Sequence, residues 1–208
     1  ISEIRRKGNI YKGKVSRIEP SLGAAFVNYG AERHGFLPFK EISPQFYPEK
    51  QKRNSRLTVS DCLKKDQEIL VQVEKDERGN KGAALTTNIS LAGRYLVLMP
   101  NNPKAAGISR RLEGKERDKL KERIASLNVP VSMGLIVRTA GEGKDLEDLK
   151  WDLEYLQRVW EGISEANTLK NSPILIFKES DIIIRALRDY LKEAVSYTHL
   201  RAHETVRN

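Results

Sequence analysis

Five short segments with the pattern of β-strands fill most of the first 90 residues, and this spacing limits the folds open to the chain. They cover residues 9–20, 23–30, 33–39, 67–76 and 82–90. Alternation is clearest in the fourth segment, where Ile69, Val71 and Val73 share one face. A Gly-Asn pair before the fifth segment is typical of a tight hairpin. Five short strands in succession predict a small closed barrel.

The remainder of the chain mixes expected helices and strands, which indicates an α+β fold overall. Strands are predicted at 95–100, 134–139 and 173–179, and helices at 114–127 and 144–166. The second helix carries an apolar stripe: Leu146, Leu149, Leu153, Leu156, Trp160 and Ile163. Its acidic residues fall mainly on the other face, and we interpret them as solvated and not as a metal cluster: Asp145, Glu147, Asp148, Asp152 and Glu154. A polar and basic insertion at 49–61 is interpreted as a solvated loop.

Basic residues outnumber acidic ones by 37 to 28, for a formal net charge of +9. This balance favours a polyanionic partner such as RNA, DNA or an anionic membrane face. No apolar run approaches the ~18 residues of a membrane span, and the polar, basic start does not resemble a signal peptide. The single cysteine, Cys62, excludes an internal disulfide, so we expect a reducing, cytoplasmic setting. Because the chain begins with Ile1, we expect a fragment or a processed end.

The stretch "GLIVRTAGEGKD" (134–145) combines a buried strand with groups that suit an anion. Gly141 and Gly143 allow a sharp turn or a close approach to a ligand. Arg138 offers a guanidinium fork beside the Thr139 hydroxyl, and exposed amides nearby would complete a phosphate site. The alternative is a strand end whose arginine makes a surface ion pair.

Aromatic and basic residues on the predicted barrel indicate a nucleic-acid face. Phe26 lies in the middle of the second strand, Phe36 in the middle of the third beside His34, and Lys81 follows the last turn. Aromatic faces stack on unpaired bases, and lysine holds phosphates. The alternative for each phenylalanine is a place in the core.

Four long stretches resemble the bacterial ribonuclease E/G family, and its ribonuclease E branch more than its ribonuclease G branch. They read "GNIYKGKVSRIEPSLGAAFVNYGAERHGFLPF", "DERGNKGAALTTNISLAGRYLVLMPNNP", "GISRRLEG" and "GLIVRTAG". The resemblance runs to about Ala194. It implies an S1-type RNA-binding OB barrel at 5–88, a five-prime sensor domain at 89–183, and the start of a truncated RNase H-like segment at 184–194.

The resemblance also implies roles for particular residues. Arg138 and Thr139 would form the pocket for a five-prime monophosphate, and Gly93 and Val97 would contact the terminal nucleotide. On the barrel, the RNA-gripping positions correspond to Phe26, Phe36 and Lys81. Because the family cuts RNA in a later domain, no catalytic residue and no cofactor is expected in this chain. Magnesium and a structural zinc are expected in the missing part.

The same resemblance implies an endoribonuclease that cleaves single-stranded RNA in RNA processing and mRNA decay. The whole protein would be a homotetramer and a hub for other RNA-decay proteins, cytoplasmic or peripheral to the inner membrane. A stand-alone RNA-binding module without nuclease activity is the first alternative. A translation-type factor with a bare barrel ranks last, because it leaves 134–145 unexplained.

The end of the chain, residues 195–208, breaks the pattern of the preceding sequence. It resembles a tail that recurs in translated draft sequence, and we expect it to be foreign to the protein. His199 and His203 stand one helical turn apart there, as a metal pair would. Since no third ligand accompanies them by motif, we expect no metal site.

Overall fold

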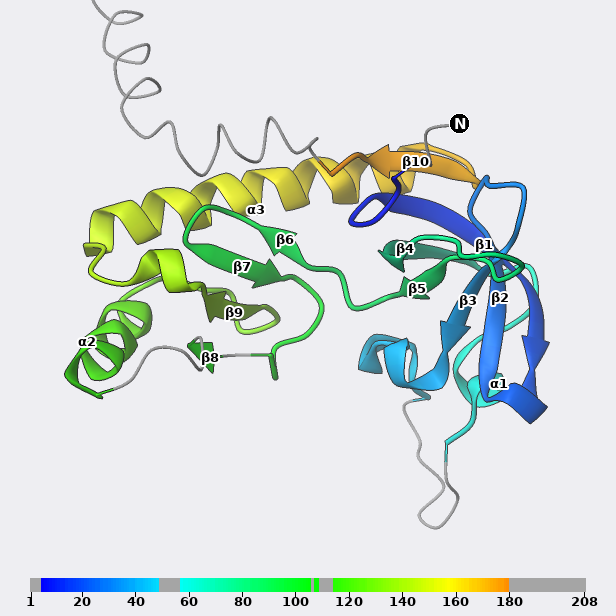
Figure 1. The fold of residues 1–208 in the computed structure, drawn as a ribbon, viewed down its shortest axis with the longest axis horizontal. Coiled ribbons are helices and arrows are strands. Elements are labelled where there is room, and N and C mark those ends of the chain that lie inside the picture. Colours follow the sequence, from blue (N-terminus) through cyan, green and yellow to red (C-terminus); the bar gives the residue numbers. More distant parts are fainter. Residues whose placement is uncertain (1–4, 49–56, 106, 109–113, 180–208) are drawn as a thin grey trace, which may run out of the picture.

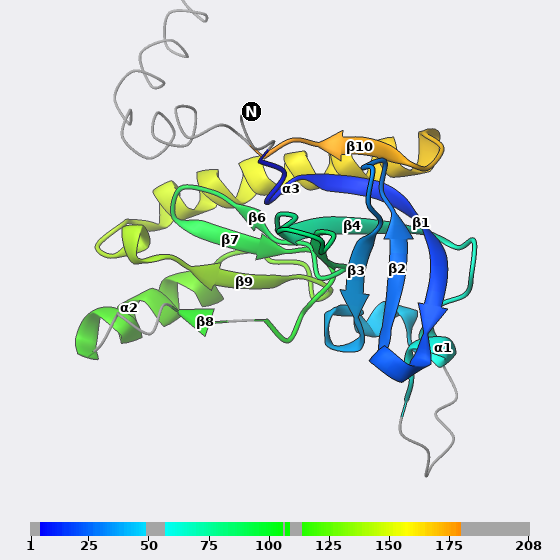
Figure 2. The same cartoon turned by 45° about the vertical axis from the view of Figure 1, so that its right-hand side comes forward.

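A computed structural model describes residues 5–48, 57–105, 107–108 and 114–179 (Figure 1). The predicted RNase H-like segment at 184–194, the tail at 195–208, and the pair His199 and His203 lie outside the described residues. The described chain forms a barrel and a smaller four-stranded sheet, with one long helix running alongside both (Figures 1 and 2).

The barrel closes through five strands, as the sequence predicts. They are β1 (Ile10–Glu19), β2 (Ala24–Asn28), β3 (Gly35–Pro38), β4 (Glu68–Lys75) and β5 (Ala84–Thr86). Strand β1 pairs antiparallel with both β2 and β4, β2 with β3, and β4 with β5, while a parallel pairing of β3 with β5 completes the ring. Alternate side chains fill the interior, and Val15, Val27, Leu37, Val71 and Leu85 are fully buried there.

Strand β5 ends earlier than the expected strand at 82–90. Beyond Thr86 the backbone leaves the barrel ladder and binds other partners: Thr87 N donates to Glu41 O (2.9 Å) and Ile89 N to Asn101 Oδ1 (3.2 Å). Asn101 Nδ2 in turn donates to Thr87 O at 2.6 Å. These residues therefore form a hydrogen-bonded connection out of the barrel.

The interpretation of the insertion at 49–61 as a solvated loop is wrong for its last part. Residues 57–58 lead into a short helix, α1 (Val59–Cys62), whose Val59 and Cys62 side chains are buried against the barrel core. Asp61 accepts a hydrogen bond from Thr58 N at 2.8 Å, which caps this helix. Residues 49–56 lie outside the described part.

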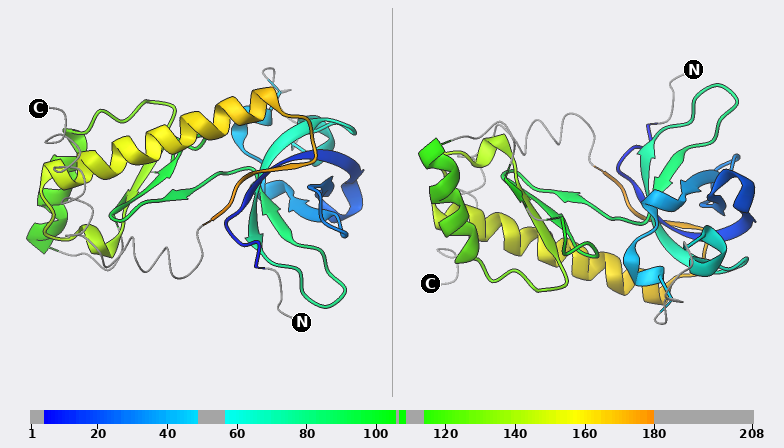
Figure 3. Two further views of the ribbon diagram at one scale, coloured as in Figure 1. Left: turned by 90° about the horizontal axis from the view of Figure 1, so that it is seen from above. Right: turned by 90° about the horizontal axis from the view of Figure 1, so that it is seen from below.

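The second sheet contains four strands in the order β6-β7-β9-β8. These are β6 (Leu91–Ala92), β7 (Leu96–Met99), β8 (Gly107–Ile108) and β9 (Gly134–Val137), of which β6 and β8 were not predicted. Helix α3 (Leu146–Leu169) lies along one side of this sheet and α2 (Gly114–Ala125) lies near β8 (Figure 3). The predicted strand at 134–139 ends at Val137, because a 3-10 turn begins at Thr139.

Helix α3 buries the predicted apolar stripe with one exception. Leu149, Leu153, Leu156 and Ile163 are buried, and Trp160 packs partly buried against the same core. Leu146, by contrast, is 39% exposed, so its assignment to the stripe is wrong. It occupies the first helical position, where the Asp145 carboxylate caps the helix by accepting from Asp148 N at 2.8 Å.

A last strand, β10 (Ile174–Phe177), returns to the barrel and pairs antiparallel with β1. The end of α3 is fastened to the same place. Lys12 Nζ donates to the carbonyl oxygens of Asn167 (2.9 Å) and Lys170 (2.8 Å), where a cation compensates the helix C-terminus. Glu68 lies 3.0 Å from Lys12 Nζ and accepts from Ser172 Oγ at 2.7 Å. Strand β1 thus holds the helix and β10 against the barrel.

This junction is expected to weaken in acid. The hydrogen bonds from Ser172 and Lys12 lower the pKa of Glu68 from 4.5 to about 2. Because the folded pKa is depressed, the stabilisation is present above about pH 4.5 and is lost as the pH falls towards 2. Thermal midpoints of the Glu68→Gln variant should therefore fall less than those of the wild type between about pH 5 and about pH 2.5. Glu74→Gln, at an exposed site on β4, is the control; an equal fall in all three proteins contradicts the prediction.

Candidate nucleic-acid interface

Phe26 and Phe36 lie side by side on the outer surface of the barrel. They are direct partners in the β2–β3 register, and their ring centroids are 5.8 Å apart in an edge-to-face arrangement. Both are half-buried, while the alternating neighbours Ala25, Val27 and Leu37 fill the interior. The two rings therefore face outwards and are not part of the barrel core.

Two neighbouring residues that the sequence did not single out extend this surface. The Arg17 guanidinium lies 4.7 Å from the centre of the Phe26 ring. Ser16 Oγ donates to Phe26 O (3.0 Å) and lies 2.8 Å from His34 Nδ1. Arg17 is the register partner of Phe26 on β1, and Ser16 lies beside it where the register shifts.

Lys81 is exposed near the tip of the β4–β5 hairpin, where its backbone bridges to Arg78. The hairpin lies against the start of β3. Gly82 makes this approach possible, because a Cβ there would come within 2.3 Å of His34 O. Arg33 Nη1 also donates to Gly79 O. These contacts bring Lys81 to the same end of the barrel as His34.

Arg138 follows β9 and contacts the turn between β6 and β7. Its backbone N–H donates to Tyr95 O at 2.8 Å, and its guanidinium Nη1 donates to Gly93 O at 2.5 Å and to Arg94 O at 3.3 Å. The guanidinium is therefore held in place by backbone carbonyls.

The Asp152 side chain binds the backbone of this turn, a contact that the sequence analysis missed. Its carboxylate is 1% exposed and accepts from three successive backbone amides: Arg94 N (3.0 Å), Tyr95 N (2.8 Å) and Leu96 N (2.9 Å). The interpretation of Asp152 as part of a solvated face is therefore wrong. A signal was present, since Asp152 lies three residues after Leu149 on the apolar stripe.

Gly93 is required by this carboxylate. A Cβ on Gly93 would lie 2.5 Å from Asp152 Oδ2, a distance that real side chains do not reach. The absence of a side chain at Gly93 thus lets the turn lie close to the Asp152 carboxylate.

Of the other predicted residues, one lies in the turn after β9 and one on β7 of the same sheet. Thr139 is exposed at the start of its 3-10 turn, and Val97 is half-buried on β7, opposite Ile136. The sequence analysis expected exposed backbone amides after β9 that could bind a phosphate, but three of these amides are already used. The amides of Gly141, Glu142 and Lys144 donate to carbonyls within the turn itself. Gly143 adopts φ +68°, as a sharp turn requires.

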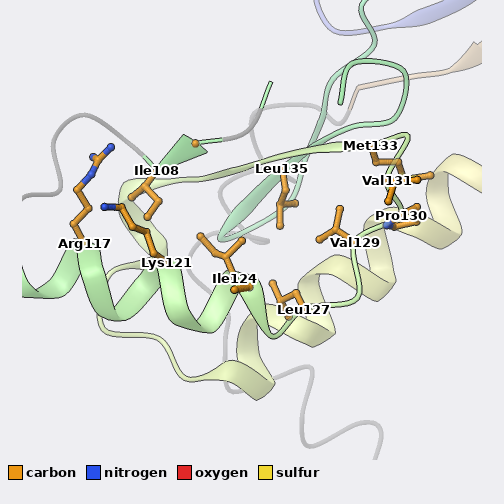
Figure 4. Close-up of a pocket in the computed structure, with 12 residues that line it drawn as sticks. Ile108, Arg117, Lys121, Ile124, Leu127, Val129, Pro130, Val131, Met133 and Leu135 are labelled. Carbon is orange, nitrogen blue, oxygen red and sulfur yellow. The ribbon is translucent and has the colours of Figure 1, made fainter. Parts of the chain in front are cut away.

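An apolar groove of about 480 Å³ lies elsewhere, between α2 and the segment that leads into β9 (Figure 4). Ile124, Val129 and Leu135 line it, and Arg117 and Lys121 stand at one end. It contains none of the residues predicted to bind RNA. The described part of the chain also has no cluster of three potential metal ligands, and none of its helices has the length and apolarity needed to cross a membrane.

Comparison with known proteins gives a match for each part of the chain. The S1 RNA binding domain model matches residues 5–88, and the ribonuclease E/G family model matches residues 90–208. Ribonuclease E of Haemophilus influenzae and of Escherichia coli are each 59% identical over 191 residues, or 92% of this chain. Ribonuclease G of Salmonella typhimurium is 40% identical over 187 residues, 88% of this chain.

These relatives are much longer proteins. The chain spans 20% of the Haemophilus protein, 18% of the Escherichia protein and 38% of the Salmonella ribonuclease G. The S1 RNA binding domain model covers the residues that form the five-stranded barrel. With more than half of its residues matched by the family model, this chain belongs to the ribonuclease E/G family.

Proposed function

We propose that this chain is the RNA-recognition part of a bacterial endoribonuclease that cleaves single-stranded RNA in RNA processing and mRNA decay. In this proposal the barrel binds unpaired RNA, and Arg138 with Thr139 binds a five-prime monophosphate. The observation that carries it is the orientation of Arg138, whose Nη1 is held by the carbonyls of Gly93 and Arg94.

A guanidinium in a fixed orientation suits a terminal phosphate. Its planar donors match two phosphate oxygens, and the exposed Thr139 hydroxyl can donate a further bond. A five-prime hydroxyl offers no such charge. A triphosphate is too bulky for a tight pocket. In this proposal Gly93 and Val97 contact the terminal nucleotide.

On the barrel, the outward rings of Phe26 and Phe36 provide stacking surfaces for bases, and Lys81 a charge for the backbone. Cleavage by a magnesium-dependent carboxylate site, and zinc-linked assembly into a homotetramer that recruits other RNA-decay proteins, belong in this proposal to parts outside this chain. The expected setting is the cytoplasm or the inner face of the membrane.

The test is binding of the purified chain to a single-stranded RNA of about 12 nucleotides. Two forms are compared, one with a five-prime monophosphate and one with a five-prime hydroxyl. We expect the monophosphate to bind about tenfold to a hundredfold tighter, as a charged bidentate contact suggests. Equal affinity for the two forms contradicts end recognition by this chain, and no binding of either form contradicts the proposal as a whole.

The barrel surface is tested separately by Phe36→Ala. Loss of one stacked base should weaken both RNA forms equally, by about fivefold to a hundredfold. Tyr155→Ala removes an exposed aromatic ring from α3 and is the matched control, which should bind as the wild type does. Circular dichroism checks that both variants fold. If Phe36→Ala binds like the control, the phenylalanine pair is not an RNA surface.

A further inference from the structure

Arg17 stands at one end of a row of residues that crosses the barrel surface from strand to strand. It is the register partner of Phe26 on β2, Phe26 is the partner of Phe36 on β3, and Phe36 is the partner of Ala84 on β5. Strands β1, β2 and β3 lie side by side (Figure 2), and β5 follows β3 in the sheet. The row thus begins with a cation, continues through two outward rings and ends at a small side chain.

The Phe26 ring restrains the Arg17 side chain in this row. The guanidinium carbon lies 4.7 Å from the ring centre, and Arg17 is exposed. Within the part of the chain that the structure describes, the Arg17 side chain makes no ion pair. Glu19, the acid of β1, instead accepts from Ser21 Oγ at 2.7 Å. Arg17 is therefore held by a ring contact, which leaves its charge available at the surface.

A guanidinium that stacks on an aromatic ring keeps its N–H donors, because these lie in its own plane and not on the face that meets the ring. Such donors match two oxygens of a phosphate. A base that stacks on the phenylalanine pair brings the phosphates of its nucleotide to the edge of that pair. On the β1 side this edge is Arg17, whereas Lys81 leads into β5 at the other end of the row.

We propose that Arg17 binds a phosphate of the nucleotide whose base stacks on the phenylalanine pair, and that the Phe26 ring positions the guanidinium for this contact. This inference rests on the proposed function, since it takes Phe26 and Phe36 as the place where RNA binds the barrel. It places the RNA across β1, β2 and β3, with Arg17 at one side and Lys81 at the other. A backbone contact carries no sequence information, so it adds affinity for either form of the five-prime end.

The test compares Arg17→Gln with the wild type in binding to the single-stranded RNA of about 12 nucleotides. We expect both end forms to bind about threefold to fivefold more weakly at low salt, with an unchanged ratio between them. The slope of log affinity against log salt should fall by about 0.7, as for one phosphate contact on a single strand. Arg158→Gln removes another exposed arginine, on α3, and is the matched control that should keep the wild-type slope. Arg17→Lys retains the charge and should keep most of the slope.

The part played by the Phe26 ring is tested with Phe26→Leu, which keeps an apolar side chain but removes the ring. If the ring positions Arg17, the effect of Arg17→Gln should be smaller in the Phe26→Leu background than in the wild type. Equal effects in the two backgrounds overturn the positioning role of Phe26. Thermal unfolding checks that the single and double variants fold.

Two results for Arg17→Gln overturn the phosphate contact. One is binding with the affinity and salt slope of the wild type. The other is tighter binding, because the guanidinium would then only cover the Phe26 ring. The variant Phe36→Ala separates these results from a failure of the proposed function. If Phe36→Ala weakens binding and Arg17→Gln does not, only the inference on Arg17 fails. If Phe36→Ala also binds like the wild type, the barrel surface of the proposed function fails instead.

Discussion

Replacing Asp152 with alanine is expected to lower the free energy of unfolding by about 3 kcal/mol. The carboxylate is buried and accepts from the amides of Arg94, Tyr95 and Leu96. Alanine would leave buried donors without an acceptor, and each such donor costs about 1–3 kcal/mol. Part of this cost is recovered if water enters the space that the carboxylate leaves. The loss should be visible as a lower urea midpoint with an unchanged slope.

Two further variants separate the hydrogen bonds from the charge and from the helix. Asp152→Asn keeps one acceptor oxygen, so its loss should lie between those of the wild type and alanine. Glu154→Ala changes an exposed acid two residues along the same helix and should stay within about 0.5 kcal/mol of the wild type. If the free energy of unfolding of Asp152→Ala is as close to the wild-type value as that of Glu154→Ala, the turn does not depend on Asp152.

Replacing Arg138 with alanine is expected to abolish the preference for a five-prime monophosphate, a change of about tenfold to a hundredfold in relative affinity. The affinity for the five-prime hydroxyl RNA should change little, because the barrel residues remain. Measured by fluorescence anisotropy, the two RNA forms should give nearly equal dissociation constants. The reason is the loss of the guanidinium that Gly93 and Arg94 orient.

The form of the side chain matters as well as its charge. Arg138→Lys retains a positive charge but not the planar fork, so it should recover only part of the preference. Thr139→Val removes one hydroxyl at the same volume and should have a smaller effect than Arg138→Ala. If Arg138→Ala keeps the full preference, the five-prime phosphate binds elsewhere and Arg138 serves only to fasten the turn.

The strands of the barrel and the long helix could be predicted because their signals are local. The alternation of Ile69, Val71 and Val73 shows which face of β4 is buried, and the structure confirms it. In the structure Phe26 lies between inward-facing Ala25 and Val27, so its ring faces outwards, a choice that the sequence analysis left open. The error at the end of β5 has a long-range cause. Thr87 leaves the ladder because Glu41, far away in sequence, offers its carbonyl.

The sequence by itself determined the alternating strands, the apolar stripe of α3 and the residue types suited to RNA. These depend on periods of two and of 3.6 residues, which neighbouring positions express without tertiary contacts. Only the tertiary structure decided that Asp152 is buried beneath the Arg94 turn, that β10 pairs with β1, and that Lys12 binds the end of α3. In each case a polar group or strand edge finds its partner more than 50 residues away, and such pairing depends on how the elements pack.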